Sequence, residues 1–220
     1  MKITQLETLC LSRMHEPERQ WFTARYRTVK ADCVVVILYT DAGVTGIGEA
    51  SAYGVPRRIR DWVAWLAPSL LGRDPRDPAI APHPNGRTIA YDCAIGGIDC
   101  ALWDLRGKLA GKRVCELLSE RPASQVRLYA SGGCRYDWRQ NPNALIDEVQ
   151  GYIAAGFSAC KVRIGTEWGW DGVTVERFLD LMRELSQAVA GRIELMLDGN
   201  QRLTLEQALL VARELERLGF

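Results

Sequence analysis

Three runs in the first quarter of the chain predict β-strands, the first of them from a mixed pattern of apolar residues. Lys2–Arg13 and Cys33–Thr40 are both rich in apolar residues, and the second run ends at Asp41-Ala-Gly43, a typical hairpin turn. Val44–Ser51 follows this turn as a third run. The pattern predicts a three-stranded antiparallel meander, with an irregular segment at Glu16–Lys30 between its first two strands.

Helical spacing replaces the strand pattern after residue 55. Pro56–Leu71 carries an apolar residue every three or four positions, and Thr88–Leu109 is long and largely apolar. Small residues in the second segment suit close packing against a neighbour. Val114–Leu118 predicts one more short helix, and the proline-rich segment Gly72–Arg87 predicts a loop.

Strands and helices alternate after Arg121-Pro122-Ala123-Ser124, which we take as a domain boundary. The predicted strands are Val126–Ser131, Phe157–Ile164 and Ile193–Leu197, and the predicted helices are Asn143–Ala155, Val173–Ala190 and Thr204–Leu218. Three regularly spaced strand–helix units favour a parallel sheet with right-handed crossovers. We therefore expect an α+β domain at residues 1–122 and a β/α domain at residues 123–220.

Two pairs of polar residues lie at the ends of apolar strands in the second domain. Lys161 and Arg163 are two apart on one predicted strand, and Asp198 and Asn200 are two apart at the end of the next. Residues i and i+2 of a strand share a face, and sites in parallel α/β folds lie at the carboxyl ends of strands. The pattern predicts a site for a metal ion and an anionic substrate.

Four segments of the chain resemble the enolase superfamily, specifically the mandelate racemase/muconate lactonizing enzyme group. They are Asp41-Ala-Gly-Val-Thr-Gly-Ile-Gly-Glu-Ala50, Ala94-Ile-Gly-Gly-Ile-Asp-Cys-Ala-Leu-Trp-Asp-Leu-Arg-Gly-Lys108, Gly156-Phe-x-x-x-Lys161-x-Arg163 and Leu197-Asp-Gly-Asn200. The resemblance covers essentially the whole chain. It implies an α+β capping domain followed by the first part of a (β/α) TIM-type barrel, with about three of the eight strand–helix units of a whole barrel.

The resemblance also implies a reaction and its site residues. In this group a base removes the proton α to a carboxylate, and Mg²⁺ stabilises the enediolate that forms. Asp198 resembles the first of three carboxylate metal ligands, and Asn200 a polar substrate contact. Lys161 resembles a lysine that neutralises the substrate carboxylate. Trp21 and Tyr53 fall in segments that cover the barrel mouth in this group, so we expect them to contact substrate.

Arg163 departs from the pattern, because racemases of the group carry a lysine base at this position. Guanidinium is a poor general base near neutral pH and a good bidentate donor to carboxylates. The arginine therefore favours dehydration of a sugar acid, with a base supplied from elsewhere. Alternatives are a racemase or cycloisomerase on the same scaffold, a truncated paralogue without activity, and a doubly wound α/β domain with an unrelated appendage.

The resemblance places the remaining metal carboxylates and a His–Asp pair on strands beyond Phe220. We therefore expect the 220-residue chain to be inactive by itself, poorly soluble or oligomeric, and a weak Mg²⁺ binder. An open barrel edge is the physical reason for the expected association. The partners expected for the whole protein are a small-molecule carboxylate substrate and further copies of itself.

Composition narrows the class of protein further. The chain is 47% hydrophobic and 25% charged with a formal net charge of +1, a globular composition that favours neither a nucleic-acid partner nor a strongly acidic one. Seven cysteines without a Cys-x-x-Cys pair suggest reduced thiols in the cytoplasm. Met1–Leu11 is too polar for a signal peptide, and no apolar run reaches the ~18 residues of a membrane span.

Overall fold

Two compact units make up the chain. The computed structural model describes residues 1–22, 27–52, 55–77, 88–133, 141, 143–163, 174–199 and 203–220. The first unit comprises Met1–Met14 with Lys30–Gln125, and the second comprises His15–Val29 with Val126–Phe220. The segment between the first two long strands therefore groups with the second unit, although it precedes most of the first unit in sequence.

The sheet of the first unit is the predicted antiparallel meander. Its strands are β1 (Ile3–Met14), β4 (Lys30–Thr40) and β5 (Thr45–Ser51), in the order β1-β4-β5. The inserted segment holds a 3-10 turn, η1 (Pro17–Arg19), and two short strands, β2 (Trp21–Phe22) and β3 (Arg27–Thr28). β2 and β3 pair in antiparallel fashion, so part of the segment predicted as irregular is a small hairpin.

Three helices follow the meander: α1 (Pro56–Leu70), α2 (Ile89–Ala110) and α3 (Val114–Leu118). The side chains of Val34, Val36 and Leu38 alternate along β4 and are fully buried in one core with residues of α1 and α2. Close approach between β5 and α2 depends on glycine, because a Cβ at Gly48 would overlap the carbonyl oxygen of Gly97. The predicted helices are thus confirmed, and small residues explain their tight packing.

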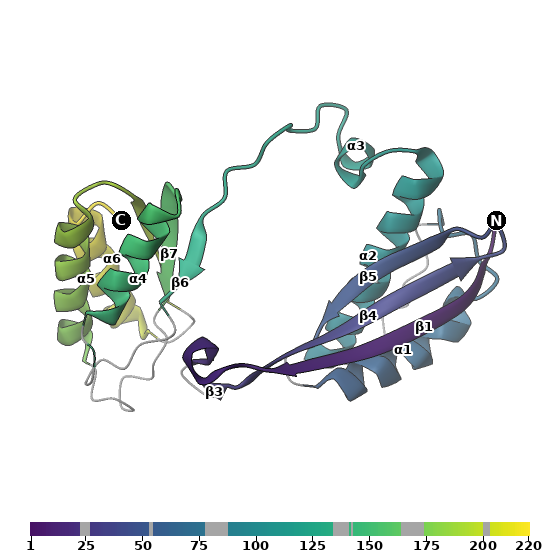
Figure 1. Cartoon of the computed structure of the whole chain (residues 1–220), viewed down its shortest axis with the longest axis horizontal. Helices are drawn as coiled ribbons and strands as arrows, with labels where there is room; N and C mark the ends of the chain where they lie inside the picture. Colours follow the sequence, from purple (N-terminus) through teal and green to yellow (C-terminus); the bar gives the residue numbers. More distant parts are fainter. Residues whose placement is uncertain are drawn as a thin grey trace. The chain divides into compact units, whose positions relative to one another are not determined.

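The second unit contains the expected parallel β/α repeats. Its strands are β6 (Ala130–Gly132), β7 (Ala159–Arg163) and β8 (Glu194–Asp198), and its helices are α4 (Ala144–Ala154), α5 (Val175–Val189) and α6 (Leu205–Arg217). The helices lie along one side of the strands (Figure 1). Cys160, Val162 and Leu195 share a buried core with residues of α4, α5 and α6.

β6 is shorter than the sequence predicts. The predicted strand Val126–Ser131 begins its ladder only at Ala130, which pairs with Cys160. β7 starts at Ala159, so residues 126–129 have no strand partner in the part of the chain that the structure describes. Val126 and Leu128 are consequently more than 70% exposed. A strand needs a neighbour as well as β-branched residues, and a sequence pattern does not reveal where the neighbour begins.

Candidate functional site

Three charged residues from neighbouring strands share one face of the parallel sheet. Lys161 and Arg163 belong to β7, and Asp198 ends β8. The register pairs Arg163 directly with Asp198, while Cys160 and Val162 point to the helix-covered side. Alternation along each strand therefore directs all three charges to the side opposite the helices, as the i, i+2 spacing predicts.

The Asp198 carboxylate is bound by both cations. Arg163 donates two hydrogen bonds to Asp198 Oδ2, from Nη2 at 2.9 Å and from Nε at 3.2 Å. Lys161 Nζ lies 3.6 Å from the same oxygen and 5.7 Å from the centre of the Tyr129 ring. Each of the three charged side chains is between 22% and 30% exposed, so solvent and small molecules can reach them. Two cations and one carboxylate leave a net positive charge that suits a carboxylate ligand.

The side chains at this face include the type of ligand that a hard cation prefers, but fewer such ligands than a metal site needs. A carboxylate oxygen at Asp198 is a ligand type that Mg²⁺ prefers. Among the described residues, however, the structure brings together no group of three or more His, Cys, Asp or Glu side chains that could hold a metal. Asp198 can thus serve as one metal ligand, and the other ligands would be water, substrate or residues outside the described set.

The glycine that follows β6, which the sequence analysis missed, packs closely against β7. Gly133 has a φ of +81°, and a Cβ there would lie 3.0 Å from the backbone nitrogen of Arg163. Its N–H donates to Glu148 Oε2 over 3.1 Å, while the Tyr152 hydroxyl donates to Glu148 Oε1 over 2.6 Å. The Gly132-Gly133 pair directly after a predicted strand was the available signal. Gly133 therefore lies close against the backbone of Arg163, the residue that binds Asp198.

Cys160 lies on the other side of the same strand and is not a candidate nucleophile. Its side chain is fully buried among apolar residues. Burial, with a smaller contribution from the negative charge of Glu148, raises the pKa of the thiol to about 11. The thiol is therefore neutral near pH 7 and packs as a small apolar group.

The other predicted substrate contacts are only partly described. Trp21 lies in β2, pairs with Thr28 and is partly buried. It falls in the same compact unit as β6, β7 and β8. Tyr53 and Asn200 lie outside the described residues.

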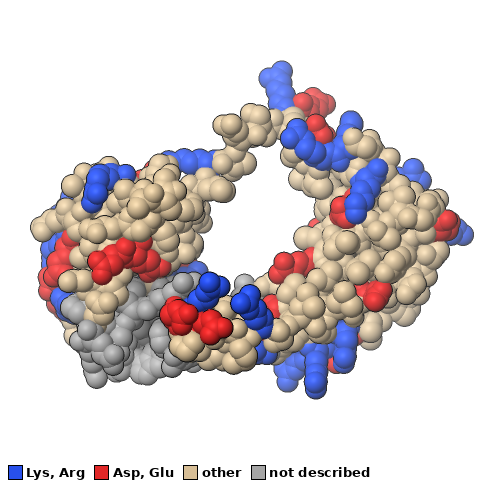
Figure 2. Space-filling model, in the orientation of Figure 1, with Lys and Arg blue, Asp and Glu red and all other residues tan. Residues whose placement is uncertain are grey.

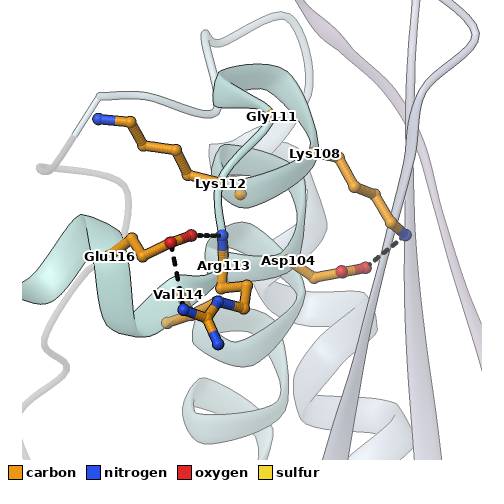
Figure 3. A pocket seen from close by; sticks show the side chains of 8 residues that line it. Asp104, Lys108, Gly111, Lys112, Arg113, Val114 and Glu116 are labelled. Carbon is orange, nitrogen blue, oxygen red and sulfur yellow. Dashed lines mark hydrogen bonds and ion pairs between the residues drawn. The ribbon is translucent and has the colours of Figure 1, made fainter. Parts of the chain in front are cut away.

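A separate charged pocket lies at the C-terminal end of α2, within the first unit (Figure 3). It has a volume of about 420 Å³. Lys108 binds Asp104 at 2.7 Å, and Arg113 binds Glu116 at 3.2 Å. Glu116 also accepts the backbone N–H of Arg113 at the start of α3. These pairs neutralise one another and join the two helix ends, so we assign them a structural role.

Charge elsewhere on the surface is mixed. Figure 2 shows Lys and Arg side chains interspersed with Asp and Glu over the visible face of each unit. The structure contains, within the residues it describes, no helix with the length and apolar character that crossing a bilayer requires.

Two family profiles match most of the chain. The profile described as "Mandelate racemase / muconate lactonizing enzyme, N-terminal domain" matches residues 7–119. The profile described as "Enolase C-terminal domain-like" matches residues 144–220. Both halves of the chain therefore match domains that occur together in the enolase superfamily.

Characterised relatives include dehydratases and a cycloisomerase. Arabinonate dehydratase of Saccharolobus solfataricus is 29% identical over 196 residues, which cover 86% of this chain and 50% of that protein. D-galactarolactone cycloisomerase of Agrobacterium fabrum is 30% identical over 218 residues, which cover 95% of this chain and 54% of that protein. A D-galactonate dehydratase of Xanthomonas oryzae is 31% identical over 80% of this chain. The chain spans about half the length of these relatives.

Solved structures show the same fold. An enolase superfamily member from Polaromonas is 28% identical with a TM-score of 0.79, and the match covers 99% of this chain and 57% of that one. Muconate lactonizing enzyme from Pseudomonas fluorescens, complexed with muconolactone, is 24% identical with a TM-score of 0.81, over all of this chain and 58% of that one. The second match is evidence of fold alone.

Proposed function

Because the chain belongs to the mandelate racemase/muconate lactonizing enzyme family of the enolase superfamily, we propose that its protein dehydrates a sugar acid after Mg²⁺-dependent abstraction of the proton α to the carboxylate. The observation that carries the choice of reaction is Arg163, a guanidinium at a position where racemases of the group carry a lysine base. The protein would act in the cytoplasm on a small carboxylate substrate, as a homo-oligomer.

Lys161 and Arg163 would bind the substrate carboxylate. Their ammonium and guanidinium groups lie on one strand face and already surround a carboxylate, that of Asp198. Arg163 can offer two N–H donors in a plane, which matches the geometry of a carboxylate. The positive charge of Lys161 would stabilise the charge that builds up on the substrate when its α-proton leaves, and its amine could assist that proton transfer.

Asp198 would bind Mg²⁺ through a carboxylate oxygen. A bound Mg²⁺ would supply a divalent charge that stabilises the negative charge developing on the substrate oxygens. Since Arg163 and Lys161 now compete for Asp198 Oδ2, these cations have to shift toward the substrate when that oxygen binds the metal. Asn200, Trp21 and Tyr53 are proposed as substrate contacts on the family resemblance.

Dehydration is favoured over racemisation because a guanidinium, such as the one at position 163, is a poor general base. A racemase needs a base on each face of the α-carbon, whereas a dehydratase needs one base and an acid that expels the β-hydroxyl. Among the relatives, the arabinonate and D-galactonate dehydratases agree with this choice. Because a D-galactarolactone cycloisomerase is also among the relatives, a cycloisomerase on the same scaffold is the second candidate function.

Product analysis distinguishes these reactions. The protein, expressed with every residue its gene encodes, is incubated with a panel of sugar acids and Mg²⁺ and assayed for 2-keto-3-deoxy acids. Dehydration is expected to disappear in Asp198→Asn and to fall at least about 100-fold in Lys161→Gln, a loss in the range typical of groups that stabilise developing charge. Asp180→Asn, which removes an exposed carboxylate paired with Arg183 on α5, should leave the rate unchanged.

Other outcomes would assign the protein differently. Exchange of the α-proton with D₂O without dehydration would identify a racemase, and interconversion of lactones would identify a cycloisomerase. A folded protein that binds Mg²⁺ but turns over no member of the panel would contradict the proposed dehydration and favour a paralogue without activity.

A further inference from the structure

The edge strand of the first unit is long and carries exposed leucines. β1 runs over 12 residues, and in the part of the chain that the structure describes its one neighbour in the sheet is β4. Leu9 is 43% exposed and Leu11 is 53% exposed, although both lie in the middle of the strand. Long exposed apolar edges tend to pair with another strand, and proteins normally shield them with charge, proline or a covering segment.

Backbone hydrogen bonds show which groups of β1 face outward. His15, directly after β1, donates its N–H to the carbonyl of Val29, so its backbone groups point toward the β4 side. Because this direction alternates along a strand, the backbone groups of Leu6, Thr8, Cys10, Ser12 and Met14 point to the open edge. Among the described residues, Ile3 exchanges hydrogen bonds with Gly72 and Arg73 at the start of β1, and the Cys10 thiol donates to the carbonyl oxygen of Pro56 over 3.7 Å.

The charges of β1 are arranged symmetrically about Cys10. Glu7 lies three residues before Cys10 and Arg13 three residues after it, while Leu9 and Leu11 flank it directly. If a second β1 pairs antiparallel about a two-fold axis at Cys10, each Glu7 faces the other copy's Arg13, and each Leu9 faces the other copy's Leu11. Opposite charges and apolar side chains that face each other across strands stabilise a sheet.

Other registers lose this complementarity. A two-fold axis at Leu9 places Glu7 opposite Leu11, and an axis at Leu11 places Arg13 opposite Leu9. The axis at Cys10 also meets the backbone requirement, because outward-facing Thr8 then pairs with outward-facing Ser12. The pattern in a single strand thus specifies both the partner and the register.

We propose that two copies of this chain associate through β1, antiparallel and two-fold symmetric about Cys10, to form one continuous six-stranded sheet. This surface goes beyond the proposed reaction, since it lies in the first unit and uses no residue of the strand-end site. An isologous contact of this kind closes on itself and gives a dimer rather than a fibre. Arg57 and Arg58 of each copy lie near Cys10 and are exposed. The arginines of the two copies would repel one another across the axis. Because physiological salt screens such repulsion beyond ~8 Å, the dimer should form best at that salt concentration.

A disulfide between the Cys10 residues of the two copies would report the position of the two-fold axis directly. Two residues that face each other in a hydrogen-bonded antiparallel pair have Cα atoms ~5.5 Å apart, within the range a disulfide can span. Mild oxidation of the full-length protein should therefore give a disulfide-linked dimer, and peptide mapping should identify Cys10 linked to Cys10. Cys10→Ser should abolish this product without changing the dimer measured by sedimentation under reducing conditions.

Charge reversal tests the register. Arg13→Glu places two acidic residues opposite each other at both ends of the pairing and should weaken dimerisation at least about tenfold. The double variant Glu7→Arg, Arg13→Glu restores opposite charges and should recover most of the affinity. Because Glu7 also accepts a hydrogen bond from the Tyr39 hydroxyl, Tyr39→Phe serves as the control for loss of that bond.

Three results would overturn the proposal. The first is a protein that stays monomeric at 100 μM, about the concentration a weak dimer requires. The others are a dimer that gives no Cys10–Cys10 product on oxidation, and a double variant that dimerises no more tightly than Arg13→Glu. None of these results bears on dehydration, so failure of this interface and failure of the proposed reaction are distinguishable.

Discussion

The two units differ in how closely their helices approach the strands and in what the uncovered sheet face carries. In the first unit, both long helices contribute to one core with the sheet, and glycines allow β5 and α2 to approach within backbone contact. In the second unit, the helices cover one sheet face, while the other carries Lys161, Arg163 and Asp198. Leu205 and Leu209 on its last helix are 79% and 49% exposed. The first unit is thus distinguished by close packing between a strand and a helix, and the second by charged side chains that solvent can reach.

The largest expected effect is on packing in the first unit. Gly48→Ala places a Cβ against the backbone of α2 at Gly97 and should lower the free energy of unfolding by about 3 kcal/mol, the upper part of the range for overpacked sites. Gly96→Ala, one residue from Gly97, meets open space and should be neutral or stabilise by ~0.5–1 kcal/mol. Urea unfolding of both variants measures the contrast. Similar losses at the two positions would mean that close approach is not what this core depends on.

Exposed leucines of the second unit give the next largest effect. Leu205→Gln with Leu209→Gln removes apolar surface from α6 and should lower self-association of the 220-residue chain roughly 30-fold, since burying half of each leucine at a contact contributes about 1 kcal/mol. Leu118→Gln on α3 of the first unit, where the leucine is also exposed, is the matched control and should change association less. Sedimentation velocity measures both. An equal effect at Leu118 would remove the distinction between the units.

A partly buried ion pair gives the first unit a pH dependence of its own. The Asp32 side chain is 2% exposed, and burial alone would raise its pKa, but hydrogen bonds from Lys30 and Ser12 outweigh burial and lower the pKa. A folded pKa below the unfolded one stabilises the protein at neutral pH, and this contribution is lost as pH falls below the ordinary value of 3.8.

Asp32→Asn should therefore reduce the free energy of unfolding by about 1–2 kcal/mol at pH 7, and the difference from the unsubstituted protein should shrink below pH 4. Urea midpoints measured at pH 7 and pH 3 test this. A difference that is constant across the range would show that ionisation of Asp32 is not the cause.

The smallest expected effect concerns the strand-end site. Arg163→Met removes two hydrogen bonds to Asp198 and should strengthen Mn²⁺ binding, used as a probe for Mg²⁺, roughly two- to fivefold, as for a partly exposed ion pair. Arg183→Met, which removes ion pairs with Asp180 on α5 and Glu214 on α6, is the control. Electron paramagnetic resonance of free Mn²⁺ gives the affinity without turnover. Weaker binding in Arg163→Met would show that the arginine supports the metal rather than competing with it.

The spacing of apolar residues predicts most of the fold, because an element that is buried on one side needs apolar residues at regular intervals. The alternation of Val34, Val36 and Leu38 repeats every two residues, as a sheet with one covered face requires. The capping box at Thr204 and Gln207 was also predictable, since both partners lie within one turn of the chain. The shared face of Lys161 and Arg163 belongs to the same class of local prediction.

Features that depend on a neighbour were not predictable from these patterns. The start of β6 depends on where β7 begins, and the role of Glu148 depends on Gly133, which precedes it by 15 residues. The short hairpin of β2 and β3 carries no alternation long enough to reveal it. Grouping of His15–Val29 with the second unit also follows from contacts rather than sequence order.

By itself, the sequence determined the order of strands and helices, the charged residues at the strand ends and the family to which the chain belongs. Only the tertiary structure decided that Arg163 and Lys161 both bind one oxygen of Asp198, and that Gly133 packs against Arg163. The physical reason is register. A strand specifies from its own residues which side chains share a face, but the charge that each one meets depends on the alignment of the next strand.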